Sequence, residues 1–344
     1  MIKCVVWDLD NTLLDGVYLE SAERPPAVNA ALVTVLRDLA GRGIVHAIAS
    51  RNPPDAGQYA ERATDHAFAA IQCGWGSKPT AIETIAAELG MTADELAFVD
   101  DDALERAEVS FRLPQVLVLA PQDLPAAADW PQFSPPAVTD EARRRGELYL
   151  QRRSRQEEAR AHGGSRDDFL RFCHTTVTIA AAVTEDLPRL HELSVRTHQF
   201  NSTGTAVGEA QFASLLGSAE HRVATVRLAD RFGDDGLVGA CVIAVGARCW
   251  QVSLLMMSCR ALGRGVIDAL LAWICRAASD AGAEEIAVTC VLSPSNVPLR
   301  IALAGAGFRA AQTAPAEGAR RAAVYRRALG EVLPAVPDWV TVPG

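Results

Sequence analysis

Two carboxylates one residue apart lie near the start of the chain. Asp8 and Asp10 follow the apolar run Cys4-Val5-Val6-Trp7, and Thr12 comes just behind them. The apolar run predicts a buried strand, and on an extended strand two side chains spaced by two residues point to the same side. Two such carboxylates repel each other unless a cation lies between them, and Mg²⁺ prefers to share carboxylates with a substrate phosphate. We therefore expect a phosphoryl-transfer site, although a solvated turn after a strand is the alternative for this pair alone.

The two carboxylates would take different parts in the reaction, besides binding the metal. We expect Asp8 to be the nucleophile that takes the phosphoryl group, and Asp10 to protonate the leaving oxygen and later to activate water. The acidic run after the predicted strand 96–99 would supply the remaining metal ligands, Asp100 and Asp101. An ordinary acidic loop is the alternative for that run taken singly.

Groups that could hold a phosphate follow at suitable places. Ser50 and Arg51 come directly after the predicted buried strand 44–49, where a hydroxyl and backbone N–H groups could bind phosphate oxygens. Lys78 lies just ahead of a helix that is predicted to begin near Thr80, and its ammonium would neutralise charge as the phosphoryl group moves. Singly, Ser50 could be a helix cap and Lys78 a solvated side chain. The joint order of these elements favours one site.

These motifs resemble the haloacid dehalogenase (HAD) superfamily of Asp-nucleophile phosphotransferases, whose motifs are a DxD strand end, a Ser/Thr strand end, a Lys and a late acidic pair. The resemblance implies the family roles for Asp8, Asp10, Ser50, Lys78 and Asp100. It also implies a direct or water-mediated contact of the neighbouring Asp101 with the metal. The stretches 20–43 and 52–78 are too short for a large cap domain, so we expect an open site, suited to a bulky substrate or to one delivered by a second domain.

Composition favours a two-domain cytoplasmic enzyme. With 344 residues, at roughly 150 residues per domain, the chain predicts two domains with a core each. It has no apolar run of about 18 residues, and it begins with a strand rather than a signal peptide, so no membrane partner is expected. Eight cysteines without a CxxC pair indicate a reduced compartment, and a net charge of −9 argues against nucleic-acid binding.

Strand and helix signals alternate over the first part of the chain. Strands are predicted near 3–7, 44–49, 97–100 and 115–119, and helices near 26–42, 55–64, 79–89 and 103–111. Such alternation predicts a three-layer α/β (Rossmannoid) domain, with a parallel sheet whose active site lies at the carboxyl ends of its strands. The predicted domains are a HAD-like phosphotransferase domain (1–125), a Pro-rich and Arg/Glu-rich linker with a helix (126–165), a second domain of mixed α/β type (166–330) and a C-terminal tail (331–344).

The predicted linker helix, 141–160, holds seven arginines against four glutamates. We expect a solvated helix between the domains. Docking of an acidic carrier protein on this helix is the weaker alternative.

A glycine-rich turn marks the second domain. A predicted strand at 251–258 leads into Cys259-Arg260-Ala261-Leu262-Gly263-Arg264-Gly265 and then into an amphipathic helix, 266–281. A turn of this kind exposes N–H groups at the positive end of the helix dipole and could hold a phosphate, although glycines also serve ordinary strand–helix connections. The turn resembles the R/QxxGxG/A pattern of GNAT acyltransferases, which bind the pyrophosphate of acyl-CoA. That resemblance implies pantetheine or CoA binding by Arg260, Gly263, Arg264 and Gly265.

The combination of a capless HAD domain with a GNAT-like domain resembles the FkbH-like, HAD-IIIC family. The segments Arg196-Thr197-His198-Gln199-Phe200-Asn201-Ser202-Thr203 and Asp230-Arg231-Phe232-Gly233-Asp234 also match it. The resemblance implies a bifunctional glyceryl transferase and phosphatase. Such an enzyme takes a three-carbon unit from 1,3-bisphosphoglycerate, dephosphorylates it and loads it as a thioester onto an acyl carrier protein, in polyketide or related antibiotic biosynthesis.

A cysteine would serve this transfer, because a thiolate can take the acyl group from an acyl phosphate and pass it to the phosphopantetheine thiol of the carrier. Cys259 is our candidate, since it precedes a helix N-terminus and adjoins Arg260 and Arg264, which favour a thiolate. A small apolar residue closing a strand is the alternative. His198 would act as a base or hydrogen-bond donor, although a histidine at a helix end is often structural. Polar contacts to the substrate are expected from Arg196, Gln199, Asn201 and Thr203.

Three functions from different classes remain open at this point. The first is the glyceryl transferase and phosphatase with Mg²⁺ and a carrier protein. The second is a Mg²⁺-dependent phosphatase fused to an acetyl-CoA-dependent N-acetyltransferase. The third is a non-catalytic protein that binds a carrier protein and keeps the aspartates as a remnant.

Overall fold

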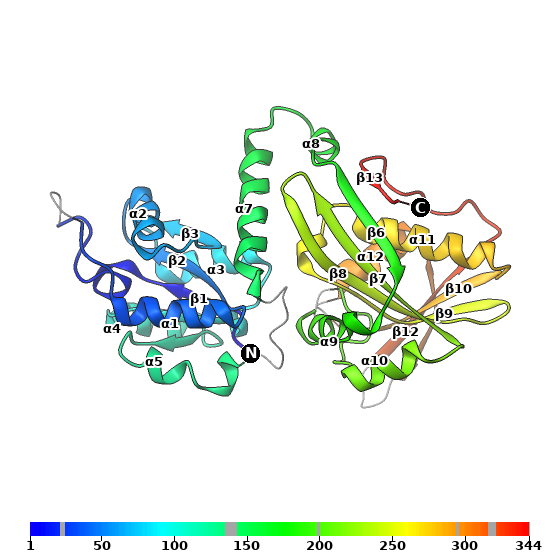
Figure 1. Cartoon of the computed structure of the whole chain (residues 1–344), viewed down its shortest axis with the longest axis horizontal. Coiled ribbons are helices and arrows are strands. Elements are labelled where there is room, and N and C mark those ends of the chain that lie inside the picture. Colours follow the sequence, from blue (N-terminus) through cyan, green and yellow to red (C-terminus); the bar gives the residue numbers. More distant parts are fainter. Residues whose placement is uncertain (21–24, 135–142, 198–199, 294–295, 316–320, 344) are drawn as a thin grey trace. The chain divides into compact units, whose positions relative to one another are not determined.

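The computed structural model describes residues 1–20, 25–134, 143–197, 200–293, 296–315 and 321–343. The chain divides into two compact units, residues 1–157 and 158–344, which we describe separately (Figure 1). Among the described helices none is long and apolar enough to cross a membrane.

The first unit contains a five-stranded parallel sheet in the order β3-β2-β1-β4-β5. Its strands are β1 (Cys4–Trp7), β2 (Val45–Ser50), β3 (Ala70–Cys73), β4 (Leu96–Val99) and β5 (Leu117–Leu119). Its main helices are α1 (Ala30–Gly41), α2 (Pro54–Thr64), α3 (Lys78–Leu89) and α4 (Ala103–Arg112), with the short α5 (Leu124–Ala127) after β5. The predicted strands and helices of this unit are confirmed to within a few residues, and β3 is an additional strand.

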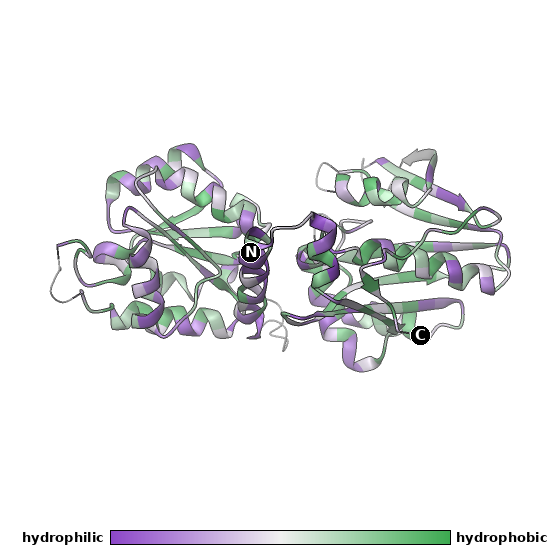
Figure 2. Ribbon diagram, turned by 90° about the horizontal axis from the view of Figure 1, so that it is seen from above, coloured by the Kyte–Doolittle hydropathy of each residue, from purple (hydrophilic) through white to green (hydrophobic). Residues whose placement is uncertain are grey.

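Both faces of this sheet are covered, because its strands are apolar throughout and need burial on each side. On one face Val5 and Trp7 pack in a core with residues of α1, α2 and α5. On the other face Cys4 and Val6 pack with Ile82 of α3 and with residues of α4. In Figure 2 the helices carry both hydrophobic (green) and hydrophilic (purple) residues. The three-layer architecture is therefore confirmed, and the described part of the unit carries no inserted cap domain.

The helix predicted at 141–160 is α7 (Arg145–Ala161), and its first half packs on the first unit. Arg145 is buried and donates a hydrogen bond to the carbonyl of Gly43 (2.7 Å). Arg153 pairs with Glu61 of α2 (2.9 Å), and Leu148 is also buried. The expectation of a solvated interdomain helix is therefore wrong for this half, because arginine pairing and a buried leucine fix it to the sheet domain.

The second unit contains an eight-stranded mixed sheet in the order β11-β12-β10-β9-β8-β7-β6-β13. Its strands are β6 (Thr175–Ala181), β7 (His221–Asp230), β8 (Gly233–Ala244), β9 (Cys249–Met257), β10 (Glu285–Val291), β11 (Arg309–Pro315), β12 (Arg321–Ala328) and β13 (Val340–Thr341). Its helices are α8 (Arg166–Phe172), α9 (Leu187–Arg196), α10 (Glu209–Leu216), α11 (Val266–Asp280) and α12 (Val297–Gly305). The predicted tail, 331–344, thus contributes an edge strand, β13, which pairs in parallel with β6.

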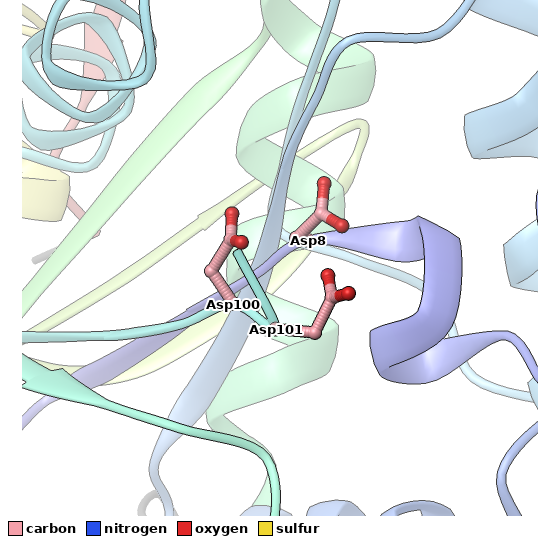
Figure 3. Close-up of side chains that lie close together, drawn as sticks. All are labelled: Asp8, Asp100 and Asp101. Carbon is pink, nitrogen blue, oxygen red and sulfur yellow. The ribbon is translucent and has the colours of Figure 1, made fainter. Parts of the chain in front are cut away.

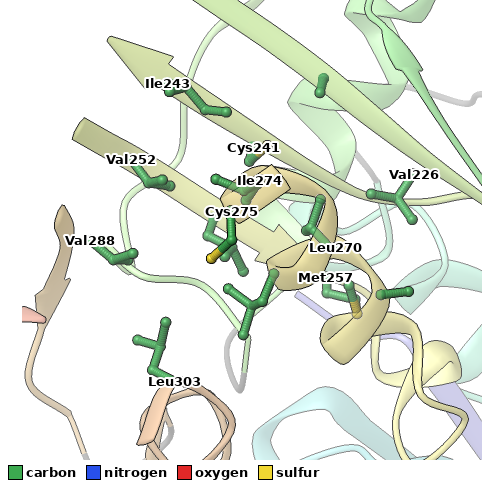
Figure 4. Close-up of a cluster of buried hydrophobic side chains, with 14 of the residues drawn as sticks. Val226, Cys241, Ile243, Val252, Met257, Leu270, Ile274, Cys275, Val288 and Leu303 are labelled. Carbon is green, nitrogen blue, oxygen red and sulfur yellow. The ribbon is translucent and has the colours of Figure 1, made fainter. Parts of the chain in front are cut away.

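Two apolar cores hold the second sheet. On one face α11 and α12 pack on the strands, and Figure 4 shows Leu270, Ile274 and Cys275 of α11 beside Ile243 and Val252. The other face packs against α9 and α10. The predicted α/β class is confirmed, because a three-layer domain with a parallel sheet is followed by a domain of mixed α/β type.

Candidate active site

Three carboxylates gather at the carboxyl ends of β1 and β4. Asp8 directly follows β1, and Asp100 and Asp101 directly follow β4. The two strands are neighbours in register, with Trp7 opposite Val99. One oxygen from each carboxylate lies within 4.8 Å of the others (Figure 3). Oxygen ligands in such a group suit a hard cation, so these three residues fit Mg²⁺.

Lys78 is enclosed by two of these carboxylates and by Glu105. It is the first residue of α3, is 2% exposed, and forms an ion pair with Asp8. Its Nζ also lies 2.9 Å from Oδ2 of Asp100 and 3.0 Å from Oε2 of Glu105, and it donates to the carbonyl of Ala49 (3.0 Å). Burial disfavours the ammonium, but the charges of Asp8 and Asp100 outweigh it and raise the pKa of Lys78. The side chain therefore stays cationic beside the metal ligands.

Burial acts in the opposite sense on the nucleophile candidate. Loss of hydration raises the pKa of Asp8 to about 7, with a smaller contribution from Asp100, while Lys78 opposes the shift. A divalent cation bound to the same oxygens would favour the ionised carboxylate.

Asp10 lies apart from this group. β1 ends at Trp7, and Leu9–Leu13 forms a tight turn in which Asn11 takes a left-handed conformation (φ 52°). The expectation that Asp8 and Asp10 share one face of a strand is therefore wrong, because the strand has ended before either residue. The carboxylate of Asp10 instead accepts hydrogen bonds from the backbone N–H of Tyr18 (2.9 Å) and from Asn52.

The predicted phosphate-binding residues lie at the end of β2 and beside it. Ser50 is buried, and a cavity of about 160 Å³ is lined by this residue, Arg51, Cys73, Lys78 and others. Arg51 is half-exposed, and its guanidinium is held by Glu105 of α4 (3.0 Å). Ser50, Arg51 and Lys78 therefore line a common recess, and the guanidinium of Arg51 also pairs with Glu105.

For three further residues of the site no role was predicted from the sequence. Thr12 accepts a hydrogen bond from the backbone N–H of Asp101 (3.0 Å) and so fixes the loop after β4. Asn52 contacts Asp10, and its position two residues after Ser50 was the available signal. Glu105 of α4 pairs with both Lys78 and Arg51. This contact depends on the packing of α3 against α4, so no local sequence pattern predicts it.

The glycine-rich turn of the second unit connects β9 to α11 as predicted. Gly263 and Gly265 have positive φ angles (72° and 81°), which explains why glycine stands at both positions. Gly263 is exposed. Gly265 is covered, because a Cβ there would lie 2.9 Å from Nε1 of Trp339 and from Cγ2 of Val340. The exposed side of the turn is therefore at Gly263, where Arg166 of α8 donates to the carbonyl (3.2 Å).

The two arginines of the turn contact aspartates of the β7–β8 hairpin. Arg264 pairs with Asp230 (2.7 Å) and with Asp235, and Arg260 donates to the carbonyl of Asp235 (3.1 Å). Both guanidiniums are buried, and buried charges need such partners. The side chains of Arg260 and Arg264 therefore bind aspartates. They were expected instead to bind pyrophosphate and to favour the thiolate of Cys259. Cys259 lies half-buried at the start of the turn.

The segment around Asn201 lies between β9 and β10. The carbonyl of Phe200 accepts from the N–H of Met257 (2.8 Å), and the carbonyl of Ser202 accepts from the N–H of Val291 (2.7 Å). Asn201 is buried, and its Oδ1 accepts from the N–H and the hydroxyl of Thr203 (3.0 and 3.1 Å). Asn201 and Thr203 thus bind each other.

Arg196, His198 and Gln199 are the other residues predicted to contact the substrate. Arg196 is half-buried at the last residue of α9. His198 and Gln199 lie outside the described residues.

Several solved structures are similar to less than half of the chain. No protein-family model and no curated protein matches the chain. The chain is similar to the ribosomal-protein-S18-alanine N-acetyltransferase of Escherichia coli (17% identity, 44% of this chain and 94% of that chain, TM-score 0.36). It is similar to a GNAT superfamily phosphinothricin acetyltransferase of Sinorhizobium meliloti in complex with acetyl-CoA (19%, 44% and 88%, 0.35). It is also similar to the N-terminal part of a Bacteroides fragilis protein, containing a phosphatase domain complexed with Mg (23%, 44% and 40%, 0.32).

Proposed function

We propose that the first unit is a Mg²⁺-dependent phosphatase or phosphotransferase that acts on a small phosphorylated metabolite. The observation that carries this proposal is the enclosure of Lys78 by Asp8 and Asp100, at the ends of two neighbouring strands. A buried ammonium beside carboxylates that suit Mg²⁺ can neutralise a phosphate and present a nucleophile to it.

Each residue of the site has its own role in the proposed reaction. Asp8, Asp100 and Asp101 would hold Mg²⁺, which supplies positive charge to the phosphate oxygens. An oxygen of Asp8 forms a bond to phosphorus while the bond from phosphorus to the leaving oxygen breaks, and Asp10 gives its proton to that oxygen. Asp10 then takes a proton from water, the water oxygen bonds to phosphorus, and Asp8 is released with inorganic phosphate.

Phosphate release from a panel of phosphorylated metabolites tests this proposal. We expect Mg²⁺-dependent release that Asp8→Asn abolishes. Asp102→Asn is the matched control, because Asp102 caps α4 outside the carboxylate group and should retain activity. Release that persists in Asp8→Asn would contradict the proposal and favour a remnant site on a carrier-binding protein.

We propose acyl transfer as the function of the second unit, with two candidate donors. The first candidate is acetyl-CoA, with an amine as acceptor. The second is 1,3-bisphosphoglycerate, whose glyceryl unit would pass through Cys259 to a carrier protein. The turn between β9 and α11 supports both candidates, and the half-buried thiol of Cys259 beside that turn supports the second.

Intact-protein mass spectrometry separates the two donors. A glyceryl or phosphoglyceryl adduct after incubation with 1,3-bisphosphoglycerate and Mg²⁺, absent in Cys259→Ala, would support the carrier pathway. Acetylation of an added amine by acetyl-CoA, unchanged in Cys259→Ala, would support the N-acetyltransferase. Cys275→Ala is the matched thiol control, since Cys275 lies buried in the core of α11.

A further inference from the structure

The amide of Asn52 joins two groups of the candidate active site. Asn52 follows β2 by two residues and is 1% exposed. Its Nδ2 lies 2.9 Å from Oδ2 of Asp10 and 3.1 Å from Oγ of Ser50. In both contacts the amide nitrogen of Asn52 is the donor, and the oxygen of Asp10 or Ser50 accepts.

A second hydrogen bond holds Asp10 from the other side. Oδ1 of Asp10 accepts from the backbone N–H of Tyr18 (2.9 Å). The hydroxyl of Tyr18 in turn donates to Asp55 in the first turn of α2 (2.9 Å). Each oxygen of Asp10 therefore has one fixed donor, and Asn52 provides the one that comes from a side chain.

Asn52 keeps this position at a cost in free energy. Its Oδ1 is buried and has no hydrogen-bond partner among the described residues. A buried amide oxygen without a partner is unfavourable. An apolar residue would avoid this cost but could not donate a hydrogen bond to Asp10.

We propose that Asn52 is a positioning residue that holds Asp10 for proton transfer to the leaving oxygen and couples it to the Ser50 hydroxyl. This inference rests on the proposed phosphotransferase function. Proton transfer accelerates departure most when the leaving oxygen is strongly basic. Loss of Asn52 should therefore harm substrates with basic leaving groups more than substrates with acidic ones.

Two aryl phosphates of similar shape test this inference. Phenyl phosphate has the more basic leaving oxygen, and p-nitrophenyl phosphate the less basic one. In the full chain with Mg²⁺ we expect Asn52→Ala to lower kcat/KM for phenyl phosphate by on the order of 10²-fold, and for p-nitrophenyl phosphate by less than about 10-fold. The ratio of the two decreases in kcat/KM does not depend on how much of the variant is folded, because both substrates are assayed with the same preparation.

The control variant is Thr84→Ala, which changes the lining of the recess without touching Asp10. It should change both substrates by the same factor. Asn52→Asp, which replaces the N–H donor by an acceptor, should reproduce the selective loss. Equal losses in Asn52→Ala would overturn the inference and leave the proposed function standing. No release from either ester by the unsubstituted chain, together with no phosphorylation of Asp8 by acetyl phosphate, would overturn both.

Discussion

The ammonium of Lys78 lies 2.9 Å from Oδ2 of Asp100, and both side chains are almost fully buried. Lys78 begins α3 and Asp100 follows β4, so the contact joins two separate segments at the carboxyl edge of the sheet. The same ammonium pairs with Asp8 of the neighbouring strand end. One lysine therefore holds together two of the carboxylates that are proposed to bind Mg²⁺.

Replacement of Lys78 should expose the repulsion between these carboxylates. We expect Lys78→Met to lower the free energy of unfolding by about 3–5 kcal/mol without metal, because breaking a buried ion pair leaves uncompensated charge. Mg²⁺ should restore part of this loss, since it supplies charge at the same place. Urea unfolding with and without Mg²⁺ measures both effects.

Lys3→Met is the matched control for that variant. Lys3 forms a largely buried ion pair with Glu95 at the opposite end of the sheet, away from the carboxylate group. Its replacement should destabilise the unit without creating a response to Mg²⁺. The same Mg²⁺ response in both variants would contradict the role given to Lys78.

Mg²⁺ should stabilise the first unit through Asp101. A ligand that binds only the folded state adds about 2.7 kcal/mol at 100 times its dissociation constant. We expect Asp101→Asn to weaken this stabilisation and Asp102→Asn to preserve it, because Asp102 accepts from the N–H of Leu104 and lies outside the carboxylate group. Thermal unfolding at increasing Mg²⁺ concentration measures the difference. Equal shifts in both variants would place the metal elsewhere.

Acid should destabilise the first unit through His46. Burial, reinforced by the charge of His66, lowers the pKa of His46 well below its usual value, and its Nδ1 accepts from the indole of Trp7 (3.0 Å). Below about pH 6.5, His46 binds a proton in the unfolded chain but stays neutral in the folded chain. The free energy of unfolding therefore falls as pH falls.

The variant His46→Gln removes this proton uptake. Between pH 6.5 and pH 5 we expect its free energy of unfolding to fall less steeply, by up to about 1.4 kcal/mol per pH unit, than that of the unsubstituted chain. Above pH 7.5 the two slopes should agree. Parallel curves through the acid range in urea unfolding would show that His46 does not control the acid sensitivity.

Position 265 should not tolerate a side chain. Gly265→Ala would place a Cβ 2.9 Å from Trp339 and Val340, besides the strain of a positive φ. Gly282→Ala is the matched control, since Gly282 has a similar φ (+80°) and open space around its Cβ position. We expect the control to cost about 1–2 kcal/mol and Gly265→Ala to cost more. Equal losses in urea unfolding would contradict the close packing of the C-terminal segment.

Much of the first unit was predictable from local patterns. Its buried strands are apolar runs; Asp8 and Asp100 each follow one directly, and Ser50 is the last residue of β2. Because parallel strands end at one edge, their order alone predicted a shared site. β3 escaped prediction because its sequence Ala70-Ile71-Gln72-Cys73 is short and interrupted by a glutamine.

The remaining features depend on contacts between distant segments. Asp10 was misplaced because a tight turn with a left-handed Asn11 replaces the expected strand. The partners of Arg264 come from the β7–β8 hairpin, far away in sequence. Gly265 is covered by the C-terminal segment, whose short strand β13 has no distinctive pattern of its own.

Locating a transferred phosphoryl group tests the central claim most directly. The chain would be incubated with acetyl phosphate and Mg²⁺, and the modified residue identified by peptide mass spectrometry after reduction of the acyl phosphate. We predict modification of Asp8, lost in Asp8→Asn and retained in Asp102→Asn. Modification of Asp10 or Asp100 with Asp8 unmodified would contradict the assignment of the nucleophile.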